Sequence, residues 1–423
     1  MSPRFASLPA WLAWQEELHP DPIDLGLHRI QLVADKLFGR AAAYPYTVTV
    51  AGTNGKGTCV TTISHLLTAC GKRVGSFTSP HLLRYNERIR IDGCEVSDEL
   101  LCAAFEAIDS ARADTSLTYF EFNALAALWI FRHEKVDIQI LEVGLGGRLD
   151  AVNIIDADIA VITNIALDHT DWLGNTRDAI GTEKAGILRP GSKLVYGESD
   201  MPASIRDRIT MLDCQCKQLD HQFRHAVTTR GWTWEGADDA GNRRSISSEL
   251  PSLPLPSVAC ALQVLAWMDI WQPEIISQQL PLLSLSGRFE RQYIDNKQLI
   301  FDVAHNPAGA TFLANRLQAT FTQRVDILFA AMADKDIGAM ITALQPVINH
   351  WYLAPLDNNP RAATTKDLSV ILDKHGIAAT GYSCGADLQT ILQAAMHVDH
   401  DTPLVIAGSF FTVAAVKAVL EHG

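Results

Sequence analysis

The strongest chemical signal in the sequence is a glycine-rich loop that carries one lysine, AGTNGKGT at residues 51–58. Glycines let the backbone N–H groups of such a loop point at phosphate oxygens, and a helix that follows adds positive potential. We expect Asn54, Gly55, Lys56 and Gly57 to bind the phosphates of ATP, with Lys56 neutralising the β and γ phosphates. The Thr58 hydroxyl is a candidate magnesium ligand, although Gly57 separates it from Lys56 where the standard motif has no intervening residue.

A carboxylate at a strand end is the second signal. Residues 138–142 read as a buried strand that ends in Glu142, and the glycine-rich turn VGLGGRLD follows at 143–150. Sheets with parallel strands build their sites at strand ends, and magnesium beside ATP prefers oxygen ligands, so Glu142 is a candidate ligand. A GTPase would need an Asn/Thr-Lys-x-Asp clamp after a strand; the sequence contains no such run, so ATP is favoured.

Alternating strand and helix patterns must position these residues. The first series predicts an α/β layer with parallel strands, in which the loop at 51–58 connects a strand to a helix that Gly71 stops. Residues 215–257 change character and predict a small antiparallel excursion followed by a Pro-rich connection. The predicted strands are 47–51, 73–77, 137–142 and 159–163, and the predicted helix is 58–70.

A second α/β series begins after residue 287. Five strands with four crossovers are enough for a doubly wound, Rossmann-like sheet of its own. We therefore predict two domains, residues 1–285 and residues 286–423. In the second, the predicted strands are 299–303, 325–330, 350–354, 378–382 and 404–407, with helices at 309–320 and 387–397.

Length and charge exclude several classes of protein. A chain of 423 residues is too long for one ordinary core. Its 35 Lys and Arg against 48 Asp and Glu give a net charge of −13, and no basic patch offsets it, so nucleic acid is not an expected partner. Apolar runs stop well short of the ~18 residues of a membrane span, and the start does not read as a secretory signal. The eight scattered cysteines are typical of reduced thiols in a cytoplasmic enzyme.

Six motifs in a fixed order resemble the Mur ligase superfamily and, within it, the bacterial bifunctional dihydrofolate synthase/folylpolyglutamate synthase family. The resemblance extends from about residue 23 to residue 408. Any one motif would be weak evidence, and their joint order makes the resemblance specific. They are GTNGKGT at 52–58, SPHL at 79–82, LEVGLGGRLDA at 141–151, LDH at 167–169, EKAGI at 183–187 and DVAHNP at 302–307.

The resemblance implies both the fold and the reaction. Residues 1–285 would form a P-loop domain that binds ATP and pterin, with a parallel sheet, helices and a small antiparallel sheet. Residues 286–423 would form the Rossmann-like glutamate-ligase domain. ATP would phosphorylate a substrate carboxylate, and the amine of L-glutamate would attack the acyl phosphate. The acceptors would be 7,8-dihydropteroate, giving dihydrofolate, and the γ-carboxyl of reduced folates.

The resemblance also implies metal and catalytic residues. Thr58 and Glu142 would hold one Mg²⁺ on the ATP phosphates, and Ser79, Glu142 and His169 would hold a second. A monovalent cation is a further cofactor that the family allows. Lys184 matches a lysine that carbon dioxide carbamylates in similar enzymes, and burial beside other cations promotes the loss of its proton.

Further site residues follow from the same match. Lys56, Lys184 and His305 would be catalytic, with His305 near the phosphates and the incoming glutamate. ATP would also contact Arg288, Asp302 and the residue at 257, where this chain has Ser257 and similar sequences often have Asn. The acceptor would lie on flat aromatic faces and on carboxylates that accept hydrogen bonds from the pterin. Its candidate contacts are Ile23, Asp24, Leu25, Thr118, Tyr119, Phe120, Glu121, Leu149, Asp150 and Ala151.

Two other readings stay open. One is another Mur-type ligase, such as a cell-wall amino-acid ligase, and the other is a nucleotide-binding homologue without turnover. The second is disfavoured because the lysine, both carboxylates and both histidines of the motifs are present. The expected partners are small molecules, namely dihydropteroate, reduced folates, L-glutamate and ATP, and the expected state is a monomer in the cytoplasm with no membrane contact.

Overall fold

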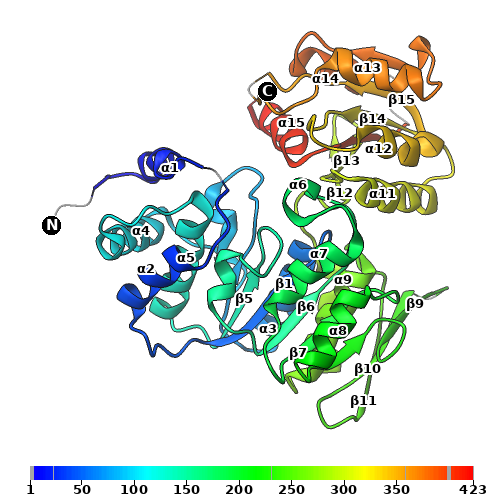
Figure 1. The fold of residues 1–423 in the computed structure, drawn as a ribbon. Helices are drawn as coiled ribbons and strands as arrows, with labels where there is room; N and C mark the ends of the chain where they lie inside the picture. Colours follow the sequence, from blue (N-terminus) through cyan, green and yellow to red (C-terminus); the bar gives the residue numbers. More distant parts are fainter. Residues whose placement is uncertain (1–3, 22, 230, 358, 398–401, 423) are drawn as a thin grey trace. The chain divides into compact units, whose positions relative to one another are not determined.

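The computed structural model describes residues 4–21, 23–229, 231–357, 359–397 and 402–422 (Figure 1). Its contacts divide the chain into two compact units, Met1–Leu283 and Ser284–Gly423. Each unit has its own sheet and its own hydrophobic core. The α/β fold with a P-loop is therefore confirmed, whereas the functional division into residues 1–285 and 286–423 stays a prediction.

A mixed sheet organises the first unit. Its inner strands pair in parallel and its β2, β3 and β4 edge pairs antiparallel. Strands β1 and β5 are buried along nearly their whole length, because helices cover both faces, and this explains their apolar and β-branched sequences. The order is β4 (Cys94–Glu95), β3 (Ile89–Ile91), β2 (Val74–Phe77), β5 (Ile138–Glu142), β1 (Tyr46–Ala51), β6 (Ile159–Ile162), β7 (Lys193–Tyr196) and β8 (Gln215–Gln218).

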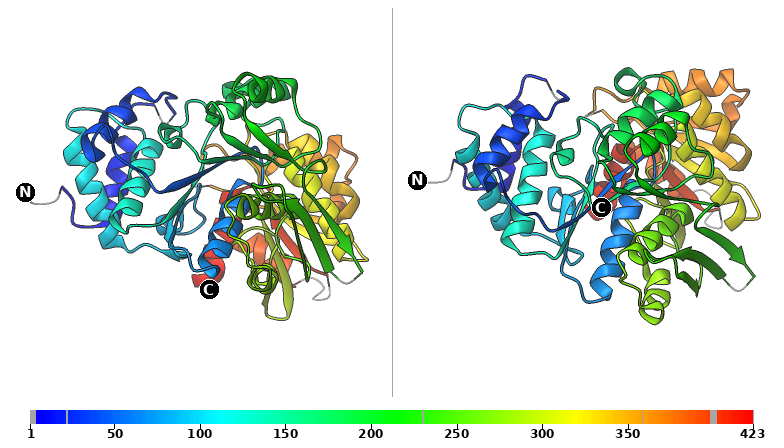
Figure 2. Two further views of the ribbon diagram at one scale, coloured as in Figure 1. Left: turned by 90° about the horizontal axis from the view of Figure 1, so that it is seen from below. Right: turned by 60° about the horizontal axis from the view of Figure 1, so that its bottom comes forward.

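Helices cover this sheet in two groups. Helix α3 packs beside α9 and against β2 and β5, and α5 packs with α4 and α2 (Figure 2). The helices are α1 (Leu8–Glu17), α2 (His28–Phe38), α3 (Lys56–Ala69), α4 (Asp98–Arg112), α5 (Tyr119–His133), α6 (Thr170–Leu173), α7 (Arg177–Lys184), α8 (Ala203–Met211), α9 (Leu255–Trp267) and α10 (Pro273–Gln279), with 3-10 turns η1 (Tyr85–Arg88), η2 (Ala151–Ile154), η3 (Ala185–Ile187) and η4 (Leu280–Leu282).

The antiparallel excursion is confirmed in part. Strands β9 (Arg224–Thr228), β10 (Gly231–Ala237) and β11 (Arg243–Ser248) form a separate antiparallel sheet in the order β11-β10-β9. Two details of the prediction were wrong. Strand β8 belongs to the large sheet, where it pairs in parallel with β7. The Pro-rich stretch is not only a connection, because its end begins helix α9. Pro254 caps α9 and Pro256 lies in its first turn, where the N–H that proline lacks would have no helical partner.

The second unit is built on a sheet in the order β12-β13-β17-β14-β15-β16. Its parallel strands confirm the Rossmann-like prediction, and the antiparallel edge strand β12 was not predicted. The strand predicted at 378–382 was wrong, because 379–381 form a 3-10 turn and the strand is Tyr382–Cys384. The elements are β12 (Glu290–Ile294), β13 (Lys297–Asp302), α11 (Pro307–Thr320), β14 (Val325–Phe329), α12 (Ile337–Leu344), η5 (Gln345–Val347), β15 (Ile348–Leu353), α13 (Thr365–Lys374), η6 (Ala379–Gly381), β16 (Tyr382–Cys384), α14 (Leu388–His397), β17 (Leu404–Ala407) and α15 (Phe410–His422).

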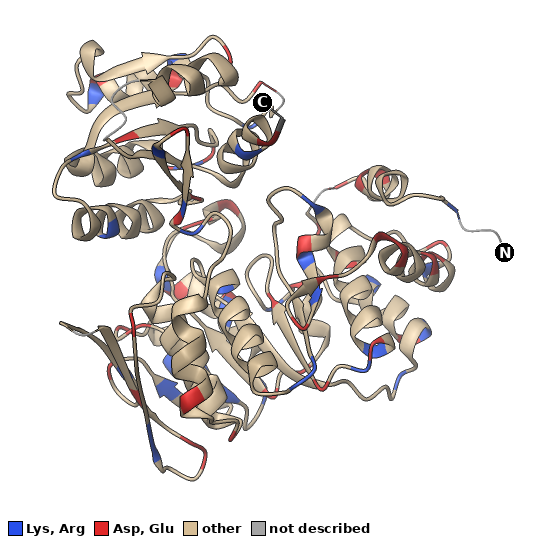
Figure 3. Ribbon diagram, turned by 180° about the vertical axis from the view of Figure 1, so that it is seen from behind, with Lys and Arg blue, Asp and Glu red and all other residues tan. Residues whose placement is uncertain are grey.

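Charged residues are interspersed over both units, with Lys and Arg beside Asp and Glu (Figure 3). Many of these pair in surface ion pairs, such as Arg73 with Glu134 at 2.7 Å. Among the helices of the described residues, none is long and apolar enough to cross a membrane.

Candidate active site

The phosphate loop lies where β1 ends and α3 begins. Gly55 has φ = 80° and caps α3, so its backbone occupies a region that favours glycine. A Cβ placed on Gly55 would lie 2.3 Å from Oγ of Ser257, which is buried at the start of α9. The structure thus brings Ser257 against the phosphate loop, across 202 positions of chain, and its predicted contact with ATP stays a prediction.

Polar residues at the end of β6 hold this loop, and the sequence analysis missed them. Oδ1 of Asn164 accepts the N–H groups of Thr53 at 3.2 Å and of Asn54 at 2.8 Å. The Thr163 hydroxyl donates to the carbonyl of Asn54 at 2.7 Å. The available signal was a Thr-Asn pair directly after a buried strand, which is the same kind of position that identified Glu142.

Two lysines meet at one backbone carbonyl. Nζ of Lys56 donates to the carbonyls of Gly52 at 3.1 Å and Thr53 at 3.3 Å, and Nζ of Lys184 donates to the carbonyl of Gly52 at 2.9 Å. Lys184 is the last residue of α7 and is buried. Burial, and next the positive charge of Lys56, lower the pKa of Lys184 to about 7. A substantial fraction of its amine is therefore neutral at neutral pH.

Oxygen ligands suited to magnesium surround the same loop. Oγ1 of Thr58 is buried and has no hydrogen-bond partner among the described residues. A buried hydroxyl without a partner is costly, unless a bound ligand or metal ion contacts it. Glu142 ends β5 and is buried, and its Oε2 accepts the N–H of Ser79 at 3.2 Å. The structure thus joins Ser79 to Glu142, and these hydroxyl and carboxylate oxygens fit a hard divalent cation.

His169 lies on the loop after β6. It has φ = 50°, caps the short helix α6 and donates its N–H to Oδ1 of Asp168 at 2.9 Å. No cluster of three or more His, Cys, Asp and Glu side chains spaced for a metal occurs in the described part of the chain. A metal at this edge of the sheet would therefore depend on hydroxyl oxygens and on the phosphates of the nucleotide as well.

Asp150 organises the glycine-rich turn after β5. Its carboxylate accepts the N–H groups of Gly144 and Leu145 at 2.9 Å and of Val152 at 3.1 Å, and it caps η2 at Ala151. Burial raises the pKa of Asp150 to about 6, against the opposing effect of these bonds. Asp150 and Ala151 thus have a clear role in shaping the turn, and their contact with the acceptor, like that of Leu149, stays a prediction.

The aromatic wall predicted for the acceptor lies beside this turn. A Cβ on Gly144 would be 2.6 Å from Cζ of Phe120, so only glycine admits the ring there. The Phe120 ring centre lies 5.7 Å from that of Phe77. Tyr119 packs edge to face on Tyr85, with ring centres 6.3 Å apart. Phe120 therefore packs on the backbone of the turn, and Tyr119, its neighbour at the start of α5, packs on Tyr85.

Thr118 and Glu121 form a capping box at the start of α5. The Thr118 side chain accepts the N–H of Glu121 at 3.2 Å, and Oε2 of Glu121 accepts the N–H of Thr118 at 2.8 Å. Oε1 of Glu121 lies 3.3 Å from Arg29, which also pairs with Asp24 at 2.5 Å. The T-x-x-E spacing was a signal for this cap that the sequence analysis did not use. Asp24 and Glu121 are thus joined through Arg29.

The remaining acceptor candidates lie just before α2. Ile23 is exposed and Leu25 is half-buried, both on the segment that carries Asp24. Asp24 is held by Arg29 from α2, and its Oδ2 lies 3.5 Å from Nε2 of His19. This segment therefore shares an ion-pair network with α5.

The second unit gathers its own candidates at the carboxyl end of β13. Asp302 is half-buried at that strand end, and its oxygens accept the N–H groups of Phe289 and Ala304, each at 2.9 Å. Burial raises the pKa of Asp302, and the charge of Arg288 opposes the rise. The guanidinium of Arg288 lies 5.0 Å from the Phe410 ring centre, and the His305 ring lies 5.8 Å from it. Phe410 was not predicted.

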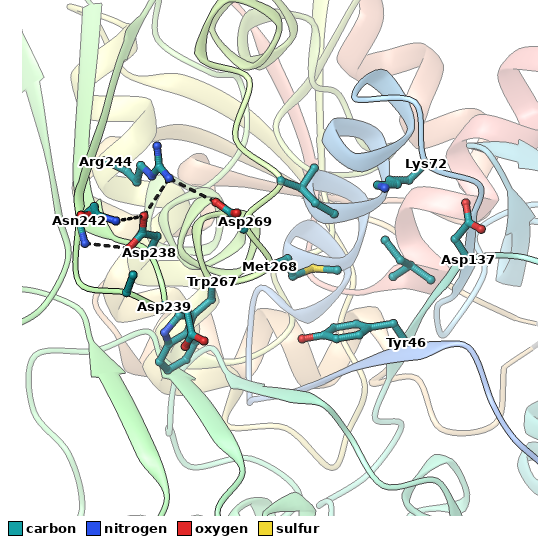
Figure 4. A pocket seen from close by; sticks show the side chains of 13 residues that line it. Tyr46, Lys72, Asp137, Asp238, Asp239, Asn242, Arg244, Trp267, Met268 and Asp269 are labelled. Atoms are coloured by element: carbon teal, nitrogen blue, oxygen red, sulfur yellow. Dashed lines mark hydrogen bonds and ion pairs between the residues drawn. The ribbon is translucent and has the colours of Figure 1, made fainter.

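A cavity of about 790 Å³ lies at the opposite end of the strands (Figure 4). Tyr46 and Ile138, the first residues of β1 and β5, line it, together with the turn between β10 and β11 and the end of α9. Arg244 there pairs with Asp238 at 2.8 Å and with Asp269 at 3.3 Å. None of the predicted site residues lines this cavity.

Two family matches cover both units. Residues 50–209 match the Mur ligase middle domain, and residues 287–410 match the Mur ligase glutamate ligase domain. The chain is 41% identical to the dihydrofolate synthase/folylpolyglutamate synthase of Escherichia coli strain K12, over 99% of this chain and 97% of that protein. It is 38% identical to the enzyme of the same name from Haemophilus influenzae, over 98% of each.

Solved structures agree in fold. The structure of E. coli FolC in complex with DHPP and ADP has a TM-score of 0.90 and 39% identity, over 99% of this chain and 98% of that one. A bifunctional folylpolyglutamate synthase/dihydrofolate synthase with Mn, AMPPNP and L-glutamate bound has a TM-score of 0.89 and 42% identity, over 98% of each chain.

Proposed function

This chain belongs to the Mur ligase family, among the dihydrofolate synthase/folylpolyglutamate synthase enzymes. We propose that the site at the carboxyl ends of β1 and β5 phosphorylates a pteroyl-type carboxylate. The chain is an ATP-dependent ligase that adds L-glutamate to dihydropteroate and to folates. The observation that carries this function is the phosphate loop with Lys56, set beside candidate oxygen ligands from Thr58 and Glu142, which are buried, and Ser79, which is half-buried.

The reaction divides into two balanced steps. A carboxylate oxygen of the acceptor attacks the γ-phosphorus of ATP, the bond to the β-phosphate oxygen breaks, and ADP leaves. The neutral amine of glutamate then attacks the acyl carbon, an amide forms as the nitrogen loses one proton, and phosphate leaves with that proton and one oxygen of the original carboxylate. Both steps bring anions together, so Lys56 and the backbone N–H groups of residues 52–58 are suited to stabilise the phosphates.

A divalent cation fits the residues present. Thr58 and Glu142 would hold it on the nucleotide phosphates, and Ser79, Glu142 and His169 would hold a second ion near the acyl group. Bound there, the ions supply Lewis-acid neutralisation of the phosphate oxygens. The enzyme structure with Mn and AMPPNP bound, 42% identical to this chain, supports divalent-metal use.

Lys184 is proposed to carry a carbamyl group. Its buried amine with a pKa of about 7 is reactive without a separate base. The neutral amine attacks carbon dioxide, a nitrogen–carbon bond forms and one proton is released. The resulting anion would replace a repulsive charge beside Lys56 with an attractive one. We also propose that the enzyme is a cytoplasmic monomer that uses a monovalent cation. Arg288 and Asp302 would contact ATP.

The test is a substrate panel with purified protein. With ATP, magnesium and glutamate, we expect phosphate release on adding dihydropteroate or a reduced folate, and none with a UDP-sugar peptide. The masses of the products should rise by one glutamyl residue per phosphate. Release with the UDP-sugar peptide alone would identify a cell-wall type of ligase, and no release with any acceptor would identify a binding protein without turnover.

A further inference from the structure

A buried guanidinium lies beside the aromatic wall. Arg88 ends η1 and is only 8% exposed. Its Nε donates to Nδ1 of His81 at 2.8 Å, and its Cζ lies 5.8 Å and 5.5 Å from the ring centres of Tyr85 and Tyr119. Because Nδ1 accepts this bond, it carries no proton, and His81 is a neutral imidazole. Within the described chain, no carboxylate lies at ion-pair distance from Arg88.

A buried guanidinium of this kind would be stabilised by an anionic ligand. Removing a cation from water without a counter-ion is costly, and two cation–π contacts with one neutral hydrogen bond offset only part of that cost. The terminal nitrogens Nη1 and Nη2 donate to no described residue, and neither is among the atoms sealed from solvent. They are therefore donors that face accessible space, in the forked geometry that suits a carboxylate.

The loop that presents Arg88 is firmly held. The carboxylate of Glu87 accepts the N–H groups of Leu82 at 2.9 Å and of Leu83 and Arg84 at 2.7 Å. The carbonyl of Arg88 accepts the N–H of Thr78 at 2.9 Å, next in sequence to Ser79. Arg88 is thus fixed between the candidate metal ligands Ser79 and Glu142 on one side and the aromatic wall at Tyr119 on the other.

We infer that Arg88 binds the α-carboxylate of the terminal glutamate of folate acceptors and thereby distinguishes them from dihydropteroate. The inference rests on the proposed function and names one residue of its acceptor site. Dihydropteroate has a single carboxylate, which must react. A folate has a reacting γ-carboxylate and a second carboxylate that does not react. An ion pair with the reacting group would withdraw charge from the attacking oxygen, whereas pairing with the other carries no such penalty.

The experiment compares the two acceptors in Arg88→Gln and Arg88→Lys. We expect Arg88→Gln to raise KM for a monoglutamyl tetrahydrofolate roughly 10- to 100-fold, with KM for dihydropteroate and kcat for both within about twofold. Arg88→Lys keeps the charge and should recover part of the loss. Arg84→Gln is the matched control, because Arg84 lies on the same loop with its side chain 68% exposed, and it should change neither KM.

A folate acceptor with its α-carboxylate converted to the amide completes the test. The wild-type protein should lose affinity for this amide, and Arg88→Gln should lose no more, since the pair is already broken. Equal losses with dihydropteroate and folate in Arg88→Gln, an effect on KM for ATP alone, or additive losses in the amide cycle would overturn the inference. Wild-type protein inactive with both acceptors would instead refute the proposed function.

Discussion

Lys56 and Lys184 donate to the same acceptor, the carbonyl oxygen of Gly52, although the two lysines are 128 positions apart. Two ammonium groups at one oxygen repel each other, so the arrangement favours the neutral form of the more buried one, Lys184. The carbonyl of Gly52 in the phosphate loop thus holds Lys56 and a second, buried lysine whose pKa is lowered.

Replacing Lys184 should stabilise the fold while it abolishes activity. The pKa of Lys184 falls from 10.5 to about 7 on folding, so well below pH 7 the folded protein bears the full penalty, about 5 kcal/mol. As pH rises from 7 towards 10, folded Lys184 loses its proton first and the penalty shrinks. Lys184→Met should therefore unfold at higher temperature than wild type at pH 7, with the gap closing by pH 10.

Calorimetry in buffer free of carbon dioxide measures this effect. Lys366→Met, at an exposed lysine of α13, is the control and should leave the melting temperature unchanged. A constant gap between Lys184→Met and wild type from pH 6 to pH 10 would contradict the shifted pKa.

Gly55→Ala should weaken ATP binding for a steric and a conformational reason. The new Cβ would lie 2.3 Å from Oγ of Ser257, and the backbone has φ = 80°. Gly71, just past the other end of α3, has φ = 82° with no atom within 4 Å of such a Cβ. Gly71→Ala should thus cost about 1 kcal/mol of stability and keep ATP affinity, whereas Gly55→Ala should lose at least about 10-fold in affinity. Titration calorimetry measures the ATP affinity of both variants. Equal affinities in Gly55→Ala and Gly71→Ala would show that the contact between Gly55 and Ser257 does not affect nucleotide binding.

Thr58→Val should separate stability from metal binding. Its hydroxyl is buried without a partner in the described chain, so the isosteric valine should leave the unfolding free energy unchanged or raise it. The same change removes a magnesium ligand and should weaken Mg·ATP binding about 100-fold. Thr62→Val, one turn along α3, removes a 2.8 Å hydrogen bond to the Thr58 carbonyl. Thr62→Val should therefore lower the unfolding free energy by about 1 kcal/mol and leave Mg·ATP affinity unchanged. Urea unfolding measures the two stabilities, and nucleotide titration measures the two Mg·ATP affinities. An unaltered Mg·ATP affinity in Thr58→Val would show that Thr58 is not a metal ligand.

Thr118→Ala should affect both stability and the acceptor. Loss of the capping box costs about 1 kcal/mol and loosens the turn of α5 that carries Tyr119 and Phe120. Thr364 forms the same kind of box with Asp367 at the start of α13 in the second unit, so Thr364→Ala is a matched control. Both variants should lose similar stability in urea unfolding, and only Thr118→Ala should raise KM for dihydropteroate. An acceptor KM that rises equally in both would indicate a general effect of lost stability.

Local patterns predicted the elements that carry strong local signals. The strand, loop and helix around residues 51–58 follow from β-branched residues, glycines and helix formers in sequence. The strand at 382–384 was misplaced because it is short, lies at the sheet edge and pairs only with β15, so little in the sequence specifies its register. The helix at 255–267 was hidden behind prolines that a first helical turn accepts.

The site was predictable in its residue types and not in its long-range contacts. Glu142 and Thr58 were found because each follows a recognisable strand or loop. The bonds from Asn164 to the phosphate loop and from Lys184 to Gly52 join segments more than 100 positions apart. The importance of Arg88 depends on its burial and on the absence of a carboxylate near it in the described chain, neither of which sequence spacing encodes.

We propose above all that the acceptor carboxylate attacks ATP directly, at the carboxyl ends of β1 and β5. Dihydropteroate labelled with ¹⁸O in both carboxylate oxygens, turned over with ATP, magnesium and glutamate, tests it by mass spectrometry of the products. Each phosphate released should carry one ¹⁸O, and each amide formed should keep the other. Phosphate without ¹⁸O, from a reaction that still forms dihydrofolate, would contradict it.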